Sequence, residues 1–389
     1  MILGTGWPFG GARVSDDDRA RKWHFEPRKA AAGEVVSLPA RLGRPADGIL
    51  VGAFARNTVR AAGTPVAVDL AAVRAGGAVR WQAPDQAGWE VVGVYLASTG
   101  QKVKRAGPGA EGWVLDHFNP DAIQRYLRGF DRFLDSLPSP GLRCVFNDSW
   151  EVYGADASAH LLKTFPAQAG EPWESLWPSL MPDTDAAPSN RVRRAYREHV
   201  DETIRTIFLG ALVRWAAAHG IRVRNQAHGS PGNLIDIYAA SDIPECELFQ
   251  GAVLRLVGDE PLGGTKAGDE VQALEELLVC RMASAAAKLT GKPFASAEAF
   301  TWLGEHGRVQ LSHKRTEAAK LFACGIGQLV FHGSMASPLD VPWPGWTFYA
   351  STHVSPATAW WDDLPILNQW IARNQERLQS GSPEADYLV

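Results

Sequence analysis

Short apolar segments alternate with longer amphipathic segments through most of this 389-residue chain. Apolar residues recur at helical spacing over 119–137, behind an Asn-Pro start, and an apolar run over 142–148 ends in acidic residues. The same order then repeats, with helices expected over 192–219, 271–289 and 313–324 and strands in IRVRNQAH, IPECELF, PFASAEAF and QLVFHGS. Strands that alternate with amphipathic helices indicate βαβ units and a parallel sheet.

We therefore expect an α/β protein in which residues 1–389 form one (β/α)8 barrel of the TIM type. The apolar segment Leu3 to Pro8, bounded by glycines, is predicted to be the first barrel strand. Residues 33–96 contain short apolar runs separated by Gly, Pro and Asp, which predicts a small β-rich insertion after that strand. A doubly wound sheet is the main alternative, but no GxGxxG or GxxxxGK[ST] motif opens a helix.

Charge and composition exclude several kinds of partner. The formal net charge is -4 and the chain has no long basic run, so we expect neither nucleic acid nor membrane lipid as a partner. No apolar run is long enough to span a bilayer, and the start MILGTGWPFGG lacks the pattern of a signal peptide, which predicts a cytoplasmic protein. The 4 cysteines are scattered without a CxxC pair, so we expect buried thiols rather than a zinc site.

Acidic residues recur where the predicted strands end. In barrels the active site lies at the carboxyl ends of the strands, so acids at several of these ends favour a catalytic or metal-binding site. Each acid could alternatively cap a helix or pair with an arginine. The set as a whole favours function, because aromatic residues flank several of its members and acids are costly to bury without a purpose. Its members are Asp148, Glu151, Asp242, Glu245, Glu247, Glu298 and Glu305.

Paired carboxyl groups and exposed aromatic rings are the components of a glycosidase. Cleavage of a glycosidic bond needs one protonated carboxyl group and one ionised carboxylate. The chain has 15 tryptophans, and those after the last strand either bind sugar rings or pack against the terminal helix. His228 and His332 each precede a glycine at a strand end and either contact the substrate or bond to loop backbone. The candidate substrate contacts are Asp148, Trp150, His228, Trp302, His332 and Trp346.

Other hydrolytic mechanisms lack their motifs. No GxSxG elbow is present for a serine hydrolase, and no HExxH for a zinc protease. The long strings LGTGWPFGG, GWVLDHFNP, FNDSWEVYG, RNQAHGSPGNLIDIYAASDIPECELF, SAEAFTWLGEH and FHGSMASPLDVPWPGWTFYAST occur in this order along nearly the whole chain. Together these strings resemble glycoside hydrolase family 106, the α-L-rhamnosidases.

The resemblance implies inverting hydrolysis of terminal α-L-rhamnosyl linkages on a barrel, with glutamates as acid and base and with calcium assisting. By motif, Glu151 resembles the general acid, and Glu298 and one of Glu245 or Glu247 resemble the residues that activate water. The substrate would be a rhamnosylated small molecule or polysaccharide. The resemblance names neither the calcium ligands nor an oligomeric state.

Members of this family are usually longer, carry β domains on both sides and are periplasmic or secreted. We therefore interpret this chain as the catalytic barrel portion of such an enzyme, either from a truncated reading frame or as one piece of a split enzyme. Two alternatives remain open at this point: a barrel glycosidase that removes a different sugar, and an inactive carbohydrate-binding remnant.

Overall fold

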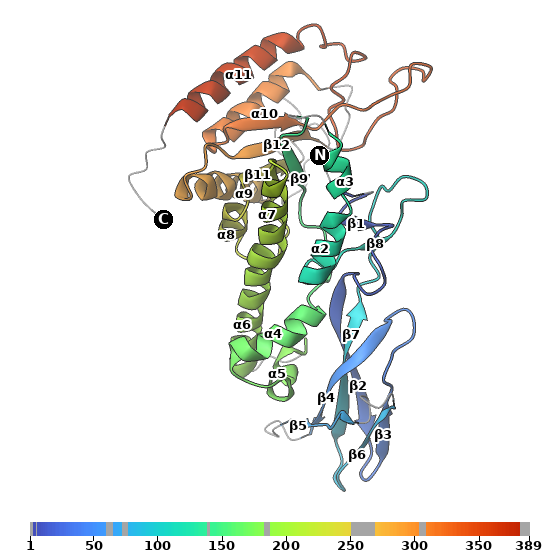
Figure 1. Cartoon of the computed structure of the whole chain (residues 1–389). Helices are drawn as coiled ribbons and strands as arrows, with labels where there is room; N and C mark the ends of the chain where they lie inside the picture. The colour runs from blue at the N-terminus through green and yellow to red at the C-terminus, as the bar shows by residue number, and fades with distance from the viewer. Residues whose placement is uncertain are drawn as a thin grey trace. The chain divides into compact units, whose positions relative to one another are not determined.

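The computed structural model describes residues 3–4, 6–59, 65–71, 77–137, 141–182, 187–249, 269–302 and 309–381 (Figure 1). The chain folds into two compact units. The parallel-sheet unit consists mainly of Leu142–Trp150 and Ala216–Val389, and the antiparallel-sheet unit of Leu3–Gly141 and Glu151–Trp215. None of the described helices is both long enough and apolar enough to cross a membrane.

The parallel-sheet unit is built on a five-stranded sheet in the order β13-β12-β11-β10-β9. Each neighbouring pair of strands is parallel, and each strand overlaps a segment that the sequence predicted to be extended, with β12 continuing one residue beyond its predicted end. The strands are β9 (Cys144–Asn147), β10 (Arg222–Gln226), β11 (Ile243–Phe249), β12 (Ser296–Thr301) and β13 (Gln328–Phe331).

Helices connect and flank these strands. The connecting helices are α8 (Leu234–Ala239), α9 (Asp269–Leu289) and α10 (Leu311–Ala323), and α11 (Leu364–Ser380) follows the last strand. The side chain of Asn233 accepts a hydrogen bond from the backbone of Ile235 and so caps the start of α8. An apolar cluster that includes Ala318 and Leu367 joins α10 to α11, and burial of these side chains holds the last helix in place.

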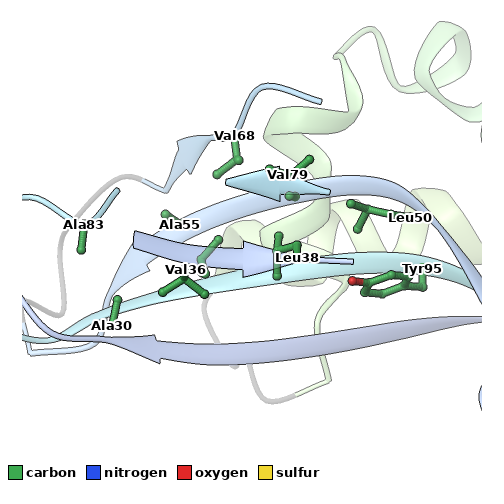
Figure 2. Close-up of a cluster of buried hydrophobic side chains, with 11 residues drawn as sticks. Ala30, Val36, Leu38, Leu50, Ala55, Val68, Val79, Ala83 and Tyr95 are labelled. Atoms are coloured by element: carbon green, nitrogen blue, oxygen red, sulfur yellow. The ribbon is translucent and has the colours of Figure 1, made fainter. Parts of the chain in front are cut away.

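The antiparallel-sheet unit contains a four-stranded sheet in the order β2-β7-β4-β5 and two separate strand pairs. Alternate side chains of its strands form a buried cluster that includes Val36, Leu38, Leu50 and Tyr95 (Figure 2). The sheet consists of β2 (Arg21–Ala30), β7 (Trp89–Ser98), β4 (Gly48–Asn57) and β5 (Val66–Ala67). The separate pairs are β3 (Val35–Leu38) with β6 (Val79–Gln82), and β1 (Gly10–Gly11) with β8 (Trp113–Val114).

Helices of this unit carry an aromatic core. Trp173 stacks on Trp177 with ring centroids 3.9 Å apart, and Trp23 meets Trp177 edge-on at 4.9 Å. Gly52 of β4 lies against this core, because a Cβ atom at that position would be 2.2 Å from Nε1 of Trp177. The helices are α2 (Pro120–Arg128), α3 (Asp131–Asp135), α4 (Ala159–Ala169), α5 (Trp173–Leu180), α6 (Ala187–Thr203), the π-helix η1 (Ile204–Leu209) and α7 (Gly210–Ala218), whose residues from Ala216 onward belong to the parallel-sheet unit.

The predicted (β/α)8 barrel is wrong. The described residues contain a five-stranded parallel sheet together with antiparallel sheets, whereas the barrel requires eight parallel strands in one closed sheet. Periodicity identifies strands and helices locally, but it does not determine which strands pair. The N-terminal strands pair antiparallel with one another, and several helices, α4 to α7, separate β9 from β10 where the barrel has one.

The first barrel strand predicted from Leu3 to Pro8 is also wrong. In this segment Trp7 forms a single antiparallel bridge with Lys104, and the first strand of the structure is β1. Gly4 has a φ of +127°, which is incompatible with a regular strand, although Leu3 is fully buried as expected for an apolar residue. Buried apolar character therefore did not identify the backbone conformation.

Candidate active site

Three carboxyl groups converge at one edge of the parallel sheet. Asp148 follows β9, and Glu247 of β11 is the direct neighbour of Glu298 in β12. One ligand oxygen from each of these residues lies within 4.8 Å of the other two. Like charges at this spacing repel one another strongly in a partly buried site, so the cluster needs protonation or a cation to balance it.

Glu298 is held by two neighbouring side chains. The amide Nε2 of Gln226 donates a hydrogen bond of 2.7 Å to Oε2 of Glu298, and Nε2 of His332 lies 3.8 Å from Oε1. Burial and the charges of Glu247 and Asp148 raise the pKa of Glu298 well above its usual range, while the bond from Gln226 opposes that shift. The carboxyl group is therefore oriented, and its ionisation depends on its neighbours.

Glu247 has a histidine partner. Nε2 of His228 lies 3.4 Å from Oε2 of Glu247, and Nδ1 of His228 lies 3.4 Å from the hydroxyl of Tyr238. The side chain of Glu247 is 12% exposed, so it combines a fixed partner with some access to solvent. Such a carboxylate can bind a hydroxyl group or a cation.

Glu245 lies deeper than the other two glutamates and is fully buried. Its carboxylate forms an ion pair with Nε of Arg224 at 2.6 Å and accepts a hydrogen bond of 2.5 Å from Oγ of Ser296. Burial raises the pKa of Glu245 to about 7, and the charge of Arg224 and the bond from Ser296 oppose that rise. Both oxygens of this carboxylate therefore have partners within the sheet.

Close contact between the segments after β9 and β10 positions the cluster. The backbone N–H of Trp150 donates to the carbonyl of His228 at 3.0 Å. Gly229 has a φ of +83°, and a Cβ atom there would be 2.5 Å from the carbonyl oxygen of Trp150, so only glycine fits. Within the sheet, Nδ2 of Asn147 donates to Oδ1 of Asn225 at 2.6 Å.

The sequence analysis did not select the polar residues of β10. Arg224, Asn225 and Gln226 lie in a strand of the sheet interior, and the two amides are at most 2% exposed. A run of three polar residues inside a predicted buried strand was the signal that could have identified them, because unpaired polar groups are costly to bury. Gln226 joins Glu245 to Glu298, with Nε2 3.4 Å from Oε1 of Glu245.

The other predicted site residues are distributed more widely. Trp302 is 5% exposed and its indole N–H donates to Glu317, so little of its ring is open to a substrate. Trp346 is 56% exposed. Glu151 belongs to the antiparallel-sheet unit, where its carboxylate forms an ion pair with Lys104 and its carbonyl accepts a bond of 2.7 Å from Gln101. Glu305 lies outside the described residues.

The carboxyl cluster is also the candidate metal site. Among the residues that the structure describes, Asp148, Glu247 and Glu298 form the group of ligand-type side chains close enough to share an ion. Carboxylate oxygens are the ligands that hard divalent cations such as Ca²⁺ prefer. The raised pKa of Glu298 reflects burial together with negative charge that a cation would balance, so these residues fit a divalent cation.

The chain matches the sequence profile of glycoside hydrolase family 106, alpha-L-rhamnosidase, over residues 55–389. The chain belongs to family 106. This assignment confirms the resemblance drawn from the sequence strings, and it covers the whole chain after the first 54 residues. The match includes all five strands of the parallel sheet and the carboxyl cluster.

Two proteins similar to this family 106 chain are longer than it is. A protein of Formosa agariphila, provisionally named a beta-glucuronidase, is 23% identical over 324 residues, which are 80% of this chain and 26% of the relative. The solved rhamnosidase from Novosphingobium sp. PP1Y aligns with a TM-score of 0.69 and 14% identity, over 98% of this chain and 52% of its own. The chain thus shares the fold of part of that rhamnosidase and spans about half of its length or less.

Proposed function

We propose that this chain is the part of an α-L-rhamnosidase that hydrolyses terminal α-L-rhamnosides with inversion at the anomeric carbon. The carboxyl cluster of Asp148, Glu247 and Glu298, in a chain of glycoside hydrolase family 106, carries this proposal. Glycosidic hydrolysis needs one carboxyl group that protonates the leaving oxygen and one that activates water. A buried cluster with perturbed ionisation is suited to that division of roles.

Glu298 is the proposed general base. The bond from Gln226 and the nearby His332 orient its carboxyl group, as a base that takes a proton from a fixed water requires. An inverting pair of carboxyl groups is roughly 6.5–9.5 Å apart. One oxygen of each cluster residue lies within 4.8 Å of the others, which is closer than such a pair, so we assign the general acid to a residue outside the cluster. The family motif gives that role to Glu151.

Glu245 and Glu247 take different parts in this proposal. Glu245 is committed to Arg224 and Ser296 and supports the sheet. Glu247 belongs to the cluster, and we assign it to ligand binding together with Asp148. Trp150, His228, His332 and Trp346 remain the proposed contacts to the sugar and its aglycone.

Asp148 and Glu247 would hold the calcium ion that the family resemblance implies. Bound there, the ion would balance the charge of the carboxylates and offer coordination positions to sugar hydroxyl groups. Gln226 and His332 would keep the carboxyl group of Glu298 directed at the water while this charge is balanced.

A β-glucuronide is the second candidate substrate, because the Formosa agariphila relative bears that name. A glucuronide carries a carboxylate, whereas rhamnose is neutral and has a methyl group at the corresponding carbon. The acidic cluster repels an anionic sugar unless a cation intervenes. Because the proposed calcium ion would remove this repulsion, the preference for the rhamnoside rests on the family match and not on charge.

A panel of aryl glycosides tests the proposed function. The chain is expected to release the aryl group from the α-L-rhamnoside faster than from the β-D-glucuronide, in buffer with Ca²⁺, and to lose this activity after EDTA treatment. The first anomer of rhamnose to appear by ¹H NMR is expected to be β, because inversion changes the α configuration. Turnover of the glucuronide alone, or release of α-rhamnose first, would contradict the proposal.

A further inference from the structure

Strand β12 is irregular immediately after Glu298. Glu247 pairs with Glu298, but Phe249 pairs with Thr301, so two steps along β11 correspond to three along β12. The extra residue makes a β-bulge, which bends a strand and changes the direction of its side chains. Bulges of this kind are frequent beside active sites.

Phe300 lies within this bulge and has an unusual backbone conformation. Its φ is +70°, in the left-handed region that glycine tolerates and a bulky aromatic residue rarely adopts. Phe300 is fully buried, and its ring packs edge-on against Phe331 with centroids 4.8 Å apart. Strain of this type persists only where the surrounding structure enforces it.

Glu317 of α10 supplies the hydrogen-bond partners that the bulge needs. Its Oε1 accepts the backbone N–H of Phe300 at 2.8 Å, and its Oε2 accepts the indole N–H of Trp302. The residue is 1% exposed, so these bonds form away from water. Glu317 thus binds the chain at both ends of the three-residue segment that follows Ala299.

Lys314 lies one turn before Glu317 and is fully buried. Its ammonium group lies 4.3 Å from the ring centroid of Phe300 and 5.0 Å from that of Trp360, and it donates to Oγ1 of Thr352. Burial lowers the pKa of Lys314 to about 7 and raises that of Glu317 to about 7, and each charge opposes the shift of the other. A helix that served only to pack on the sheet would carry apolar residues at these positions.

We propose that Glu317, with Lys314 beside it, is a positioning residue that holds the β12 bulge and thereby directs the carboxyl group of Glu298 toward Glu247 and Asp148. Without an acceptor for its buried N–H, Phe300 would leave the left-handed region, and the strand would shift toward regular pairing. A shift of one residue along a strand turns each side chain to the opposite face. The loss of catalysis expected without Glu317 rests on the proposed function, whereas the expected change in the backbone of β12 does not.

Two substitutions at Glu317 test this role. Glu317→Met keeps the size of the side chain but accepts no hydrogen bond, and Glu317→Gln keeps an acceptor for Phe300 and loses the second for Trp302. In a crystal structure of Glu317→Met, Phe300 is expected outside the left-handed region and the 2.7 Å bond from Gln226 to Glu298 is expected to be absent. On the aryl α-L-rhamnoside, the kcat of Glu317→Met is expected to fall ~10 to 100-fold with KM nearly unchanged, a loss typical of residues that orient a catalytic or metal-binding group. Glu317→Gln is expected to have a kcat between those of Glu317→Met and wild type.

Leu321→Ala is the matched control, because Leu321 lies on the same helix and is fully buried, and its aliphatic side chain has no group that could accept a hydrogen bond from the bulge. It is expected to lower the melting temperature and leave kcat unchanged. Wild-type Phe300 and Glu298 geometry in Glu317→Met would overturn the proposal, as would an equal loss of kcat in Leu321→Ala. If Glu317→Met does not fold, a wild-type kcat together with a wild-type position of Trp302 in Glu317→Gln would overturn it, because this variant has lost the acceptor for the indole N–H. The crystal structures decide the point even if the wild-type chain hydrolyses no rhamnoside, which would refute the proposed function alone.

Discussion

Burial and neighbouring negative charge act on Glu298 in the same direction, and both favour its protonated form, so the base role proposed for it would need a cation at the cluster to favour ionisation. The hydrogen bond that Gln226 donates lowers this pKa and so opposes the shift. The strand-end pattern predicted that acids would lie in this region, but it left Glu245 and Glu247 equivalent. Their difference arises from Arg224 and Ser296, whose contacts with Glu245 cross between strands and therefore depend on strand register.

Asp116 in the antiparallel-sheet unit gives a prediction for pH dependence. It is 2% exposed, and burial raises its pKa to about 8, against which the backbone N–H of Phe118 and the charge of Arg21 act. Because the folded-state pKa lies above the unfolded value of 3.8, the contribution of Asp116 to stability is complete below that value and is lost as the pH rises to about 8.

Asp116→Asn is expected to remove this dependence and to keep an acceptor for the N–H of Phe118, which lies 3.0 Å from Oδ1. Relative to wild type, the variant should gain stability on the order of a few kcal/mol between pH 5 and pH 9. Urea unfolding at both pH values measures the difference in the free energy of unfolding between variant and wild type. The neighbouring His117 is present in both proteins, so its contribution cancels in this difference. A difference between variant and wild type that does not change with pH would contradict the assignment.

At the level of elements, local sequence was sufficient to locate the five parallel strands, because short extended segments alternate with amphipathic helices there, even though β10 is mostly polar. It was insufficient for their assembly. Closure of a sheet depends on pairing between distant segments, and the interval between β9 and β10 contains helices that belong to the other unit. The bulge at Phe300 could not be predicted from local sequence either, because the carboxylate that holds it belongs to Glu317 on α10.

Gly52 of β4 gives a prediction at this scale. Trp177 is 1% exposed and stacked on Trp173, so it has little freedom to move away from an added methyl group. Gly52→Ala should therefore destabilise the antiparallel-sheet unit by about 1–3 kcal/mol, as overpacking usually does. Gly43→Ala is the control, because a Cβ atom at Gly43 meets nothing within 4 Å. Equal melting temperatures for the two variants would show that the Trp177 contact is relaxed in solution.

The whole molecule combines a parallel-sheet unit that carries the carboxyl cluster with an antiparallel-sheet unit that carries Glu151. The two similar proteins are longer than this chain, which spans 52% of the solved rhamnosidase and 26% of the Formosa agariphila protein. Membership of the family does not by itself make this chain a catalyst. Catalysis by the chain requires that the carboxyl cluster act with groups from these 389 residues.

The most direct test is kcat for an aryl α-L-rhamnoside, measured with purified wild type, Glu298→Gln and Glu376→Gln. Glu376 is an exposed residue of α11 in the same unit and controls for the loss of one carboxyl group. Removal of a general base should lower kcat by at least ~10²-fold in Glu298→Gln, while Glu376→Gln keeps the wild-type value. Wild-type kcat in a folded Glu298→Gln variant would contradict the account.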